Sequence, residues 1–125
     1  MSIAVGDKFT YDRVFTVEDV ELFTRVTGDA GRHHVVPDAD GRVMVQGLLT
    51  ATLPTKFGGD INYLAREMRF EFVRPVFTGD TIATEVVCSE AVDEDRVVRL
   101  AFDVMCKNQH GKEVLKGSTN GVIRK

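Results

Sequence analysis

The segment from Val98 to Cys106 constrains the fold of this chain more than any other. Apolar side chains alternate there with charged ones such as Arg99 and Asp103. The alternating apolar residues are Val98, Leu100, Phe102, Val104 and Cys106. Because successive side chains of a β-strand point to opposite faces, this period of two predicts a long strand with one buried face.

Other segments of the chain also have the pattern of strands. Strands are predicted over 8–15, 67–72 (Met68, Phe70 and Phe72 on one face), 82–88 (Ile82, Thr84, Val86 and Cys88) and about 113–123. Polar breaks at 93–95 and 108–111 have the length of hairpin turns. Gly117 and Gly121 in the last strand indicate close backbone approach or bulges.

A first helix is predicted after Thr16, which has the character of an N-cap, with Asp19 as its capping-box partner. An apolar stripe follows at helical spacing: Val17, Val20, Phe23 and Val26. Gly28 is a natural residue to end the helix. Residues 29–42 then read as an irregular loop, because they contain several glycine, proline and aspartate residues.

A second, apolar helix is predicted from about Gln46 to Phe57, ending at Gly58-Gly59. Its apolar side is expected to carry Leu48, Leu49, Leu53 and Phe57. Pro54 lacks an N–H group, so a kink is expected there. One central helix followed by long antiparallel strands predicts an α+β fold, a curved sheet around a helix, in a single domain over 1–125.

Composition restricts the class of protein. The 125 residues are 43% hydrophobic and 28% charged, as in ordinary globular proteins. The formal net charge of −3 argues against nucleic acid or an anionic membrane as partner. No apolar run is long enough to span a membrane, and the N-terminus lacks the pattern of a signal peptide, so a cytoplasmic protein is expected. The spacing of Cys88 and Cys106 fits neither a zinc site nor a disulfide framework, so both are expected to be buried thiols. Neither a metal nor another cofactor is predicted.

The segment Gly28-Asp29-Ala30-Gly31-Arg32-His33-His34 resembles the G-D-x-N-P-x-H loop of the MaoC-like hot-dog dehydratases, which include the (R)-specific enoyl-CoA hydratases. Gln46-Gly47-Leu48-Leu49 resembles the family's later H-G-M-L, and Arg74 to Thr81 resembles its R-P-V-x-x-G-D-T turn. The three matches follow the family's order and cover about residues 8–123. The resemblance implies a hot-dog fold, in which an antiparallel sheet wraps a central helix.

The resemblance also implies site residues. Asp29 and His34 occupy the catalytic positions, and Gly47 begins the helix whose N–H groups bind the substrate oxygen, with Gln46 and Leu48 beside it. The chain departs from the pattern where Asn-Pro is replaced by Gly31-Arg32 and where the histidine before the helix glycine is Gln46. Either the loop is held less firmly without Asn-Pro, or Arg32 contacts a carrier phosphate or a substrate carboxylate.

These residue types suit the addition of water to a trans-2-enoyl thioester. Asp29 can orient and deprotonate water, His34 can relay the proton, and the Gly47 N–H can stabilise the thioester oxygen. The leading hypothesis is therefore an enzyme, a hydro-lyase that forms an (R)-3-hydroxyacyl thioester of CoA or acyl carrier protein. A hot-dog acyl thioesterase and a non-catalytic acyl-thioester-binding protein or partner subunit are the alternatives. The resemblance further implies a homodimer or higher homo-oligomer.

Overall fold

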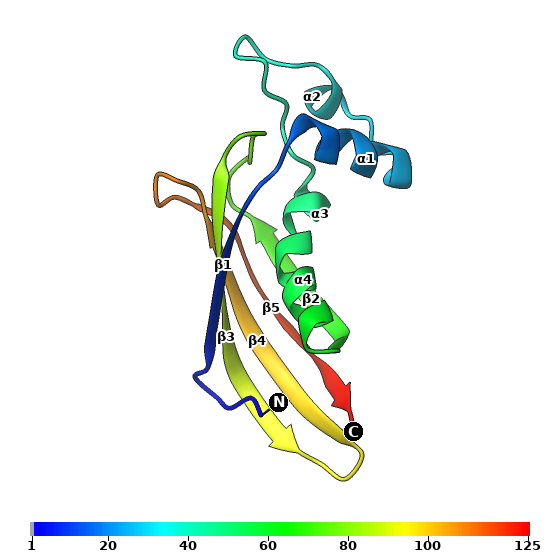
Figure 1. Cartoon of the computed structure of the whole chain (residues 1–125), viewed down its shortest axis with the longest axis vertical. Coiled ribbons are helices and arrows are strands. Elements are labelled where there is room, and N and C mark those ends of the chain that lie inside the picture. The colour runs from blue at the N-terminus through cyan, green and yellow to red at the C-terminus, as the bar shows by residue number, and fades with distance from the viewer. Residues whose placement is uncertain (1) are drawn as a thin grey trace.

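The computed structural model describes residues 2–125. In chain order its elements are β1 (Lys8–Val14), α1 (Val17–Thr27), α2 (Arg32–Val35), α3 (Gly47–Thr50), α4 (Thr52–Asp60), β2 (Leu64–Phe72), β3 (Thr81–Asp93), β4 (Val97–Lys107) and β5 (Glu113–Arg124). Figure 1 shows one curved sheet with α3 and α4 running along its concave side, while α1 and α2 lie together beyond one end of this helix pair. The predicted α+β architecture is confirmed.

The five strands form one antiparallel sheet in the order β1-β3-β4-β5-β2. The hairpin turns predicted around 93–95 and 108–111 join β3 to β4 and β4 to β5. The long β3–β4 hairpin pairs Val86 with Val104 and shifts register after Cys88, where a β-bulge bends the strand. Its curvature lets the sheet wrap around the helix.

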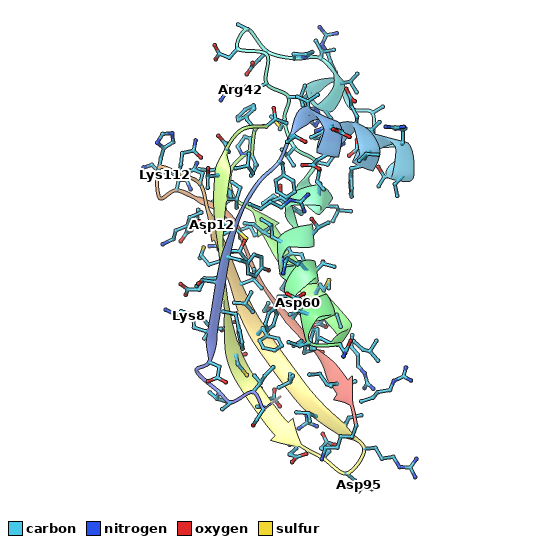
Figure 2. All side chains as sticks on the ribbon, in the orientation of Figure 1. Lys8, Asp12, Arg42, Asp60, Asp95 and Lys112 are labelled. Carbon is cyan, nitrogen blue, oxygen red and sulfur yellow. The ribbon has the colours of Figure 1, made fainter. Side chains whose placement is uncertain are left out.

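The core lies between α4 and the concave face of the sheet. The alternation predicted for β3 and β4 is confirmed, because Ile82, Val86, Leu100 and Phe102 are at most 1% exposed. The Phe57 ring on α4 packs edge-on against Phe102 with their centroids 5.1 Å apart. Charged side chains such as those of Lys8, Asp95 and Lys112 lie at the periphery in Figure 2. The thiols of both cysteines are buried, as expected.

Helix α1 begins and ends as predicted. The Thr16 hydroxyl accepts from the Asp19 N–H, and the Asp19 carboxylate accepts from the Thr16 N–H, which completes a capping box. Gly28 ends the helix in the left-handed conformation, with φ of 78°. The predicted apolar stripe is wrong at its ends, because Val17 is 41% and Val26 83% exposed. Only one side of α1 meets the rest of the chain, since the helix lies beyond the end of the sheet (Figure 1).

The predicted central helix is divided into α3 and α4, which meet at Ala51. Pro54 supplies no N–H to the carbonyl of Thr50, and the division lies beside Thr50, three residues before Pro54, where the kink was expected. Leu49, Leu53 and Phe57 are buried as predicted, but Leu48 is 66% exposed. The assignment of Leu48 to the buried side is therefore wrong. The helix also continues past Gly58-Gly59 to Asp60.

Strand β2 lies at the edge of the sheet and is held closely to β5. A Cβ atom at Gly117 would lie 1.9 Å from the carbonyl oxygen of Arg69, which confirms the predicted close backbone approach. Of the residues predicted to share one face of this strand, Met68 is 48% and Phe72 51% exposed. At the edge of the sheet the helix covers only part of this face.

The segment 29–42 is not entirely irregular, because α2 forms within it. The helix places a buried His34 against the rest of the chain, while the remainder of the segment is loop. None of the described helices is long and apolar enough to cross a membrane.

Candidate active site

The backbone of Asp29 is held at both ends by the last turn of α1. The Asp29 N–H donates to the Thr27 hydroxyl at 3.1 Å, and the Asp29 carbonyl accepts from the Thr24 hydroxyl at 3.1 Å. Thr27 in turn donates to the Phe23 carbonyl at 2.7 Å. The two threonine hydroxyls therefore hold the loop at Asp29, two residues before Gly31-Arg32, where the family pattern has Asn-Pro.

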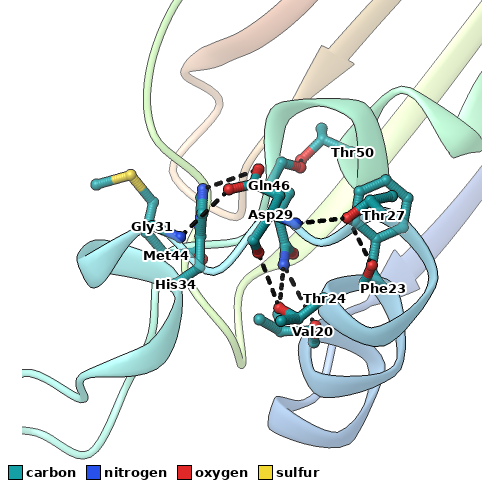
Figure 3. Close-up of polar contacts among 10 residues, drawn as sticks. All are labelled: Val20, Phe23, Thr24, Thr27, Asp29, Gly31, His34, Met44, Gln46 and Thr50. Atoms are coloured by element: carbon teal, nitrogen blue, oxygen red, sulfur yellow. Dashed lines mark hydrogen bonds and ion pairs between the residues drawn. The ribbon is translucent and has the colours of Figure 1, made fainter.

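The Asp29 carboxylate faces the side chain of His34, as Figure 3 shows. Its Oδ2 lies 3.7 Å from His34 Nε2, and its Oδ1 accepts from the Gly31 N–H at 3.3 Å. The Asp29 side chain is 50% exposed, whereas that of His34 is 7% exposed. The structure thus brings the two predicted catalytic side chains together, with that of Asp29 half-exposed and that of His34 buried.

A backbone carbonyl sets the orientation of the His34 ring. The His34 Nδ1 atom lies 2.7 Å from the carbonyl oxygen of Met44. Because a carbonyl only accepts, Nδ1 carries the proton in the neutral ring and Nε2 is left as an acceptor toward Asp29. The His33 ring packs against that of His34, with their centroids 3.9 Å apart. Both the ring plane and the tautomer are therefore fixed by neighbouring groups.

His34 and Gly47 line the same cavity, which has a volume of about 320 Å³. The Phe72 ring closes one side, and a Cβ atom at position 47 would lie 2.9 Å from it. Gly47 is the first residue of α3, and the first N–H groups of a helix have no acceptor within the helix. Glycine at this position leaves room for both the ring and a bound group beside the backbone.

Gln46, Leu48 and Arg32 do not line this cavity, and neither does Asp29. Gln46 is 1% exposed, and its amide donates to the Thr24 hydroxyl at 2.9 Å and to the Val20 carbonyl at 3.2 Å. Leu48 and Arg32 are exposed side chains. Within one copy of the chain, the predicted substrate contacts of these three residues stay predictions.

A second cavity of about 250 Å³ lies between α4 and the sheet. Its lining is mostly apolar and includes Phe57, Tyr63, Met68 and Phe102. The Tyr63 hydroxyl shares a hydrogen bond with Thr119, and burial raises the pKa of Tyr63. This cavity suits an apolar chain rather than a charged group.

The sequence did not identify every residue of the site. Thr24 and Thr27 contact Asp29 because both lie in the last turn of α1, directly before the loop that carries Asp29. Their spacing within that turn is the sequence signal that could have identified them. The Met44 carbonyl carries no sequence signature, since every residue has a carbonyl. Phe72 comes from an edge strand far along the chain. Among residues 2–125, no three His, Cys, Asp or Glu side chains gather into a group that could hold a metal ion.

No protein-family model matches the chain, and no curated sequence does. An (R)-hydratase from A. caviae involved in PHA biosynthesis superposes with a TM-score of 0.83 at 24% identity, with 96% of each chain covered. A monoamine oxidase regulatory protein from Archaeoglobus fulgidus superposes with a TM-score of 0.81 at 26% identity, covering 98% of this chain and 92% of that one. A MaoC-like dehydratase from Rhodospirillum rubrum gives 0.78 at 15% identity, covering 98% and 94%.

These matches define the class of fold. The chain has the hot-dog fold, and the resemblance to the MaoC-like proteins seen in its sequence is confirmed at the level of structure. It superposes on the (R)-hydratase and the MaoC-like dehydratase over nearly its whole length, and its own helix pair α3–α4 lies along a five-stranded sheet.

Proposed function

We propose that this protein is a hydro-lyase that adds water reversibly to a trans-2-enoyl thioester and gives the (R)-3-hydroxyacyl thioester. The observation that carries the proposal is the 3.7 Å separation of Asp29 Oδ2 and His34 Nε2, with the His34 Nδ1 proton held by Met44. Both facing atoms are acceptors in this state.

Two acceptors at this separation suit one water molecule. The water donates one hydrogen to Asp29 Oδ2 and the other to His34 Nε2, which leaves its oxygen lone pairs directed at a substrate. Such positioning supplies a large part of the rate of a reaction between two molecules. A carboxylate alone in a loop would bind water in many orientations, whereas this pair selects one.

The bonds of the reaction balance without a further reactant. The water oxygen bonds to the β-carbon, and the electrons of the carbon–carbon double bond move toward the thioester oxygen. Asp29 takes the proton from water, and that proton reaches the α-carbon through His34. The carbon–sulfur bond stays intact, which distinguishes this reaction from thioester hydrolysis.

The negative charge that develops on the thioester oxygen needs hydrogen-bond donors. We assign this role to the N–H of Gly47, which lines the same cavity as His34. A donor aimed at a developing oxyanion typically contributes on the order of a hundredfold or more in rate. The apolar cavity beside Phe57 gives the acyl chain a place away from water.

The comparisons support an enzyme of the hydratase and dehydratase class. The (R)-hydratase from A. caviae shares the fold over nearly the whole chain. CoA and acyl carrier protein both present the same thioester to Asp29 and His34.

We also propose that the protein acts as a homodimer that pairs through β2. This strand is at an edge of the sheet, so one row of its backbone groups has no strand partner among residues 2–125. Exposed apolar side chains gather on β2, where Leu64, Met68 and Phe72 are 45%, 48% and 51% exposed, and Leu48 on α3 is 66% exposed. Such a patch on an edge strand favours association.

The decisive experiment offers the purified protein enoyl thioesters of graded chain length on CoA and on acyl carrier protein. Mass spectrometry follows the gain of one water, and a chromogenic disulfide reagent follows free thiol. The proposal expects water addition with no thiol release. Thiol release without hydration would support a thioesterase, and acyl-CoA binding in calorimetry with neither reaction would support a non-catalytic binding protein.

A further inference from the structure

The side chain of Gln46 is linked to the backbone of Asp29 by a chain of two hydrogen bonds. Gln46 Nε2 donates to the Thr24 hydroxyl at 2.9 Å, and that hydroxyl donates to the Asp29 carbonyl at 3.1 Å (Figure 3). A hydroxyl has one proton, which goes to the Asp29 carbonyl, so the hydroxyl must accept from Gln46. The direction of the chain is therefore fixed from Gln46 through Thr24 to Asp29.

A second bond from the same amide fixes the Gln46 side chain against α1. Its Nε2 also donates to the Val20 carbonyl at 3.2 Å, one turn before Thr24. Gln46 is the residue before Gly47 and occupies the N-cap position of α3. The amide thus joins the end of α1, which carries Asp29, to the start of the helix that presents the Gly47 N–H.

We infer that Gln46 is a positioning residue that acts through Thr24 to set the place of Asp29 relative to His34 and Gly47. The inference rests on the proposed hydration for its catalytic consequence, although the geometry it describes does not. It assigns a role to a position where the family's histidine is replaced. It also explains how the Asp29 loop is held without Asn-Pro.

The burial of Gln46 argues against a role in stability alone. The side chain is 1% exposed, and its Oε1 atom is buried with no hydrogen-bond donor among the described groups. A buried acceptor without a donor destabilises a fold, whereas an apolar side chain of similar size has no such atom. Gln46→Leu is therefore expected to fold and to melt near the wild-type temperature.

Two substitutions at Thr24 separate positioning from helix attachment. Thr24→Val keeps the shape of the side chain and the bond from Gln46 to Val20 but removes the hydroxyl. Thr24→Ser keeps the hydroxyl and serves as the matched control. If Gln46 only attaches α1 to α3, Gln46→Leu leaves the bond from Thr24 to Asp29 and the site unchanged, and only Thr24→Val disturbs them.

The experiment measures kcat and KM for hydration of crotonyl-CoA together with the amide NMR resonance of Gly31. The Gly31 N–H donates to Asp29 Oδ1, so its chemical shift reports the place of the carboxylate without any substrate. Gln46→Leu and Thr24→Val are expected to lower kcat about tenfold or more with KM changed less than about twofold, because small displacements of a reacting group are costly. Both are expected to move the Gly31 resonance, and Thr24→Ser to restore both readouts.

The double variant Gln46→Leu, Thr24→Val tests whether the two residues act in one chain. Its kcat is expected to match that of the single variants, since removing either link breaks the same chain. Losses that multiply in the double variant would refute the inference, as would an unchanged kcat and Gly31 resonance in Thr24→Val. If the wild-type protein has no hydratase activity but the variants still move the Gly31 resonance as expected, the proposed function is overturned and the positioning role of Gln46 stands.

Discussion

The Nδ1 atom of His34 lies 2.7 Å from the carbonyl oxygen of Met44, ten residues later in the chain. This contact holds the Nδ1 proton and leaves Nε2 as the acceptor that faces Asp29. Because the partner is a backbone atom, the tautomer of the ring depends on the path of the chain between α2 and α3 rather than on a side chain. The chemistry proposed for the Asp29 and His34 pair depends on that path.

Removal of either hydrogen-bond acceptor, the Asp29 carboxylate or the His34 ring, is expected to abolish most of the hydratase activity. His34→Ala and Asp29→Asn should each lower kcat/KM by about a hundredfold to ten-thousandfold, the usual contribution of an acid–base group. Steady-state hydration of crotonyl-CoA measures the effect. His110→Ala is the control, since His110 is exposed in the turn between β4 and β5. Wild-type rates in both site variants would exclude the proposed mechanism.

A methyl group at position 47 is expected to impair the site. The Cβ atom of Gly47→Ala would lie 2.9 Å from the Phe72 ring and would stand beside the N–H assigned to the substrate oxygen. We expect a fall in kcat/KM of about tenfold to a hundredfold. The double variant Gly47→Ala, Phe72→Ala removes the contact with the ring and should stay impaired. Recovery in the double variant would show that only the ring was disturbed.

Two glycines are expected to respond to alanine in opposite directions. Gly121→Ala places a Cβ atom 2.2 Å from the Leu64 carbonyl oxygen, so β2 must move away from β5. The free energy of unfolding should fall by about 2–3 kcal/mol. Gly59→Ala in α4 meets nothing within 4 Å and should raise it by about 0.5–1 kcal/mol. Urea denaturation measures both, and a neutral Gly121→Ala would contradict the observed strand contact.

Alkaline pH is expected to destabilise the fold through a buried thiol. Burial raises the pKa of Cys106, and its contact with Thr84 lowers it by less. The unfolded chain therefore loses this proton first, near its ordinary pKa of about 8.5, while the folded chain keeps it. The unfolded state binds fewer protons above that pH, so the free energy of unfolding falls as pH rises.

Urea midpoints measured from about pH 7 to 10 test this dependence on the thiol. Cys106→Ala should show a shallower decline than the wild type. Val104→Ala, a buried position two residues earlier on β4, should lose stability equally at every pH and keep the wild-type slope. Equal slopes in all three proteins would assign the alkaline effect to other groups.

The exposed apolar row on β2 is expected to mediate dimer formation. Met68→Lys places a charge in the centre of this row and should convert the dimer to a monomer, as measured by light scattering at micromolar concentration. Leu22→Lys, at a side chain 47% exposed on α1, is the matched control and should leave the dimer intact. A monomeric wild type would contradict the proposed assembly, since stable interfaces bury about 1,000 Å² or more.

Much of the fold could be predicted from local patterns. The alternation over Val98–Cys106 predicted β4, and Thr16, Asp19 and Gly28 predicted both ends of α1. These signals are local because each depends on side-chain direction or on backbone groups a few residues apart. The predictions that were wrong concern exposure. Val26 and Leu48 have the character of core residues, but they lie where one copy of the chain offers nothing to cover them.

The sequence by itself determined which chemical groups the candidate site contains, because Asp29, His34 and Gly47 stand in a recognisable order and spacing. Only the tertiary structure decided how those groups are held. The Met44 carbonyl, the Thr24 hydroxyl and the Gln46 amide reach the site from three separate segments. Their contacts depend on how α1 packs against the start of α3, and packing between elements distant in sequence leaves no pattern in either element alone.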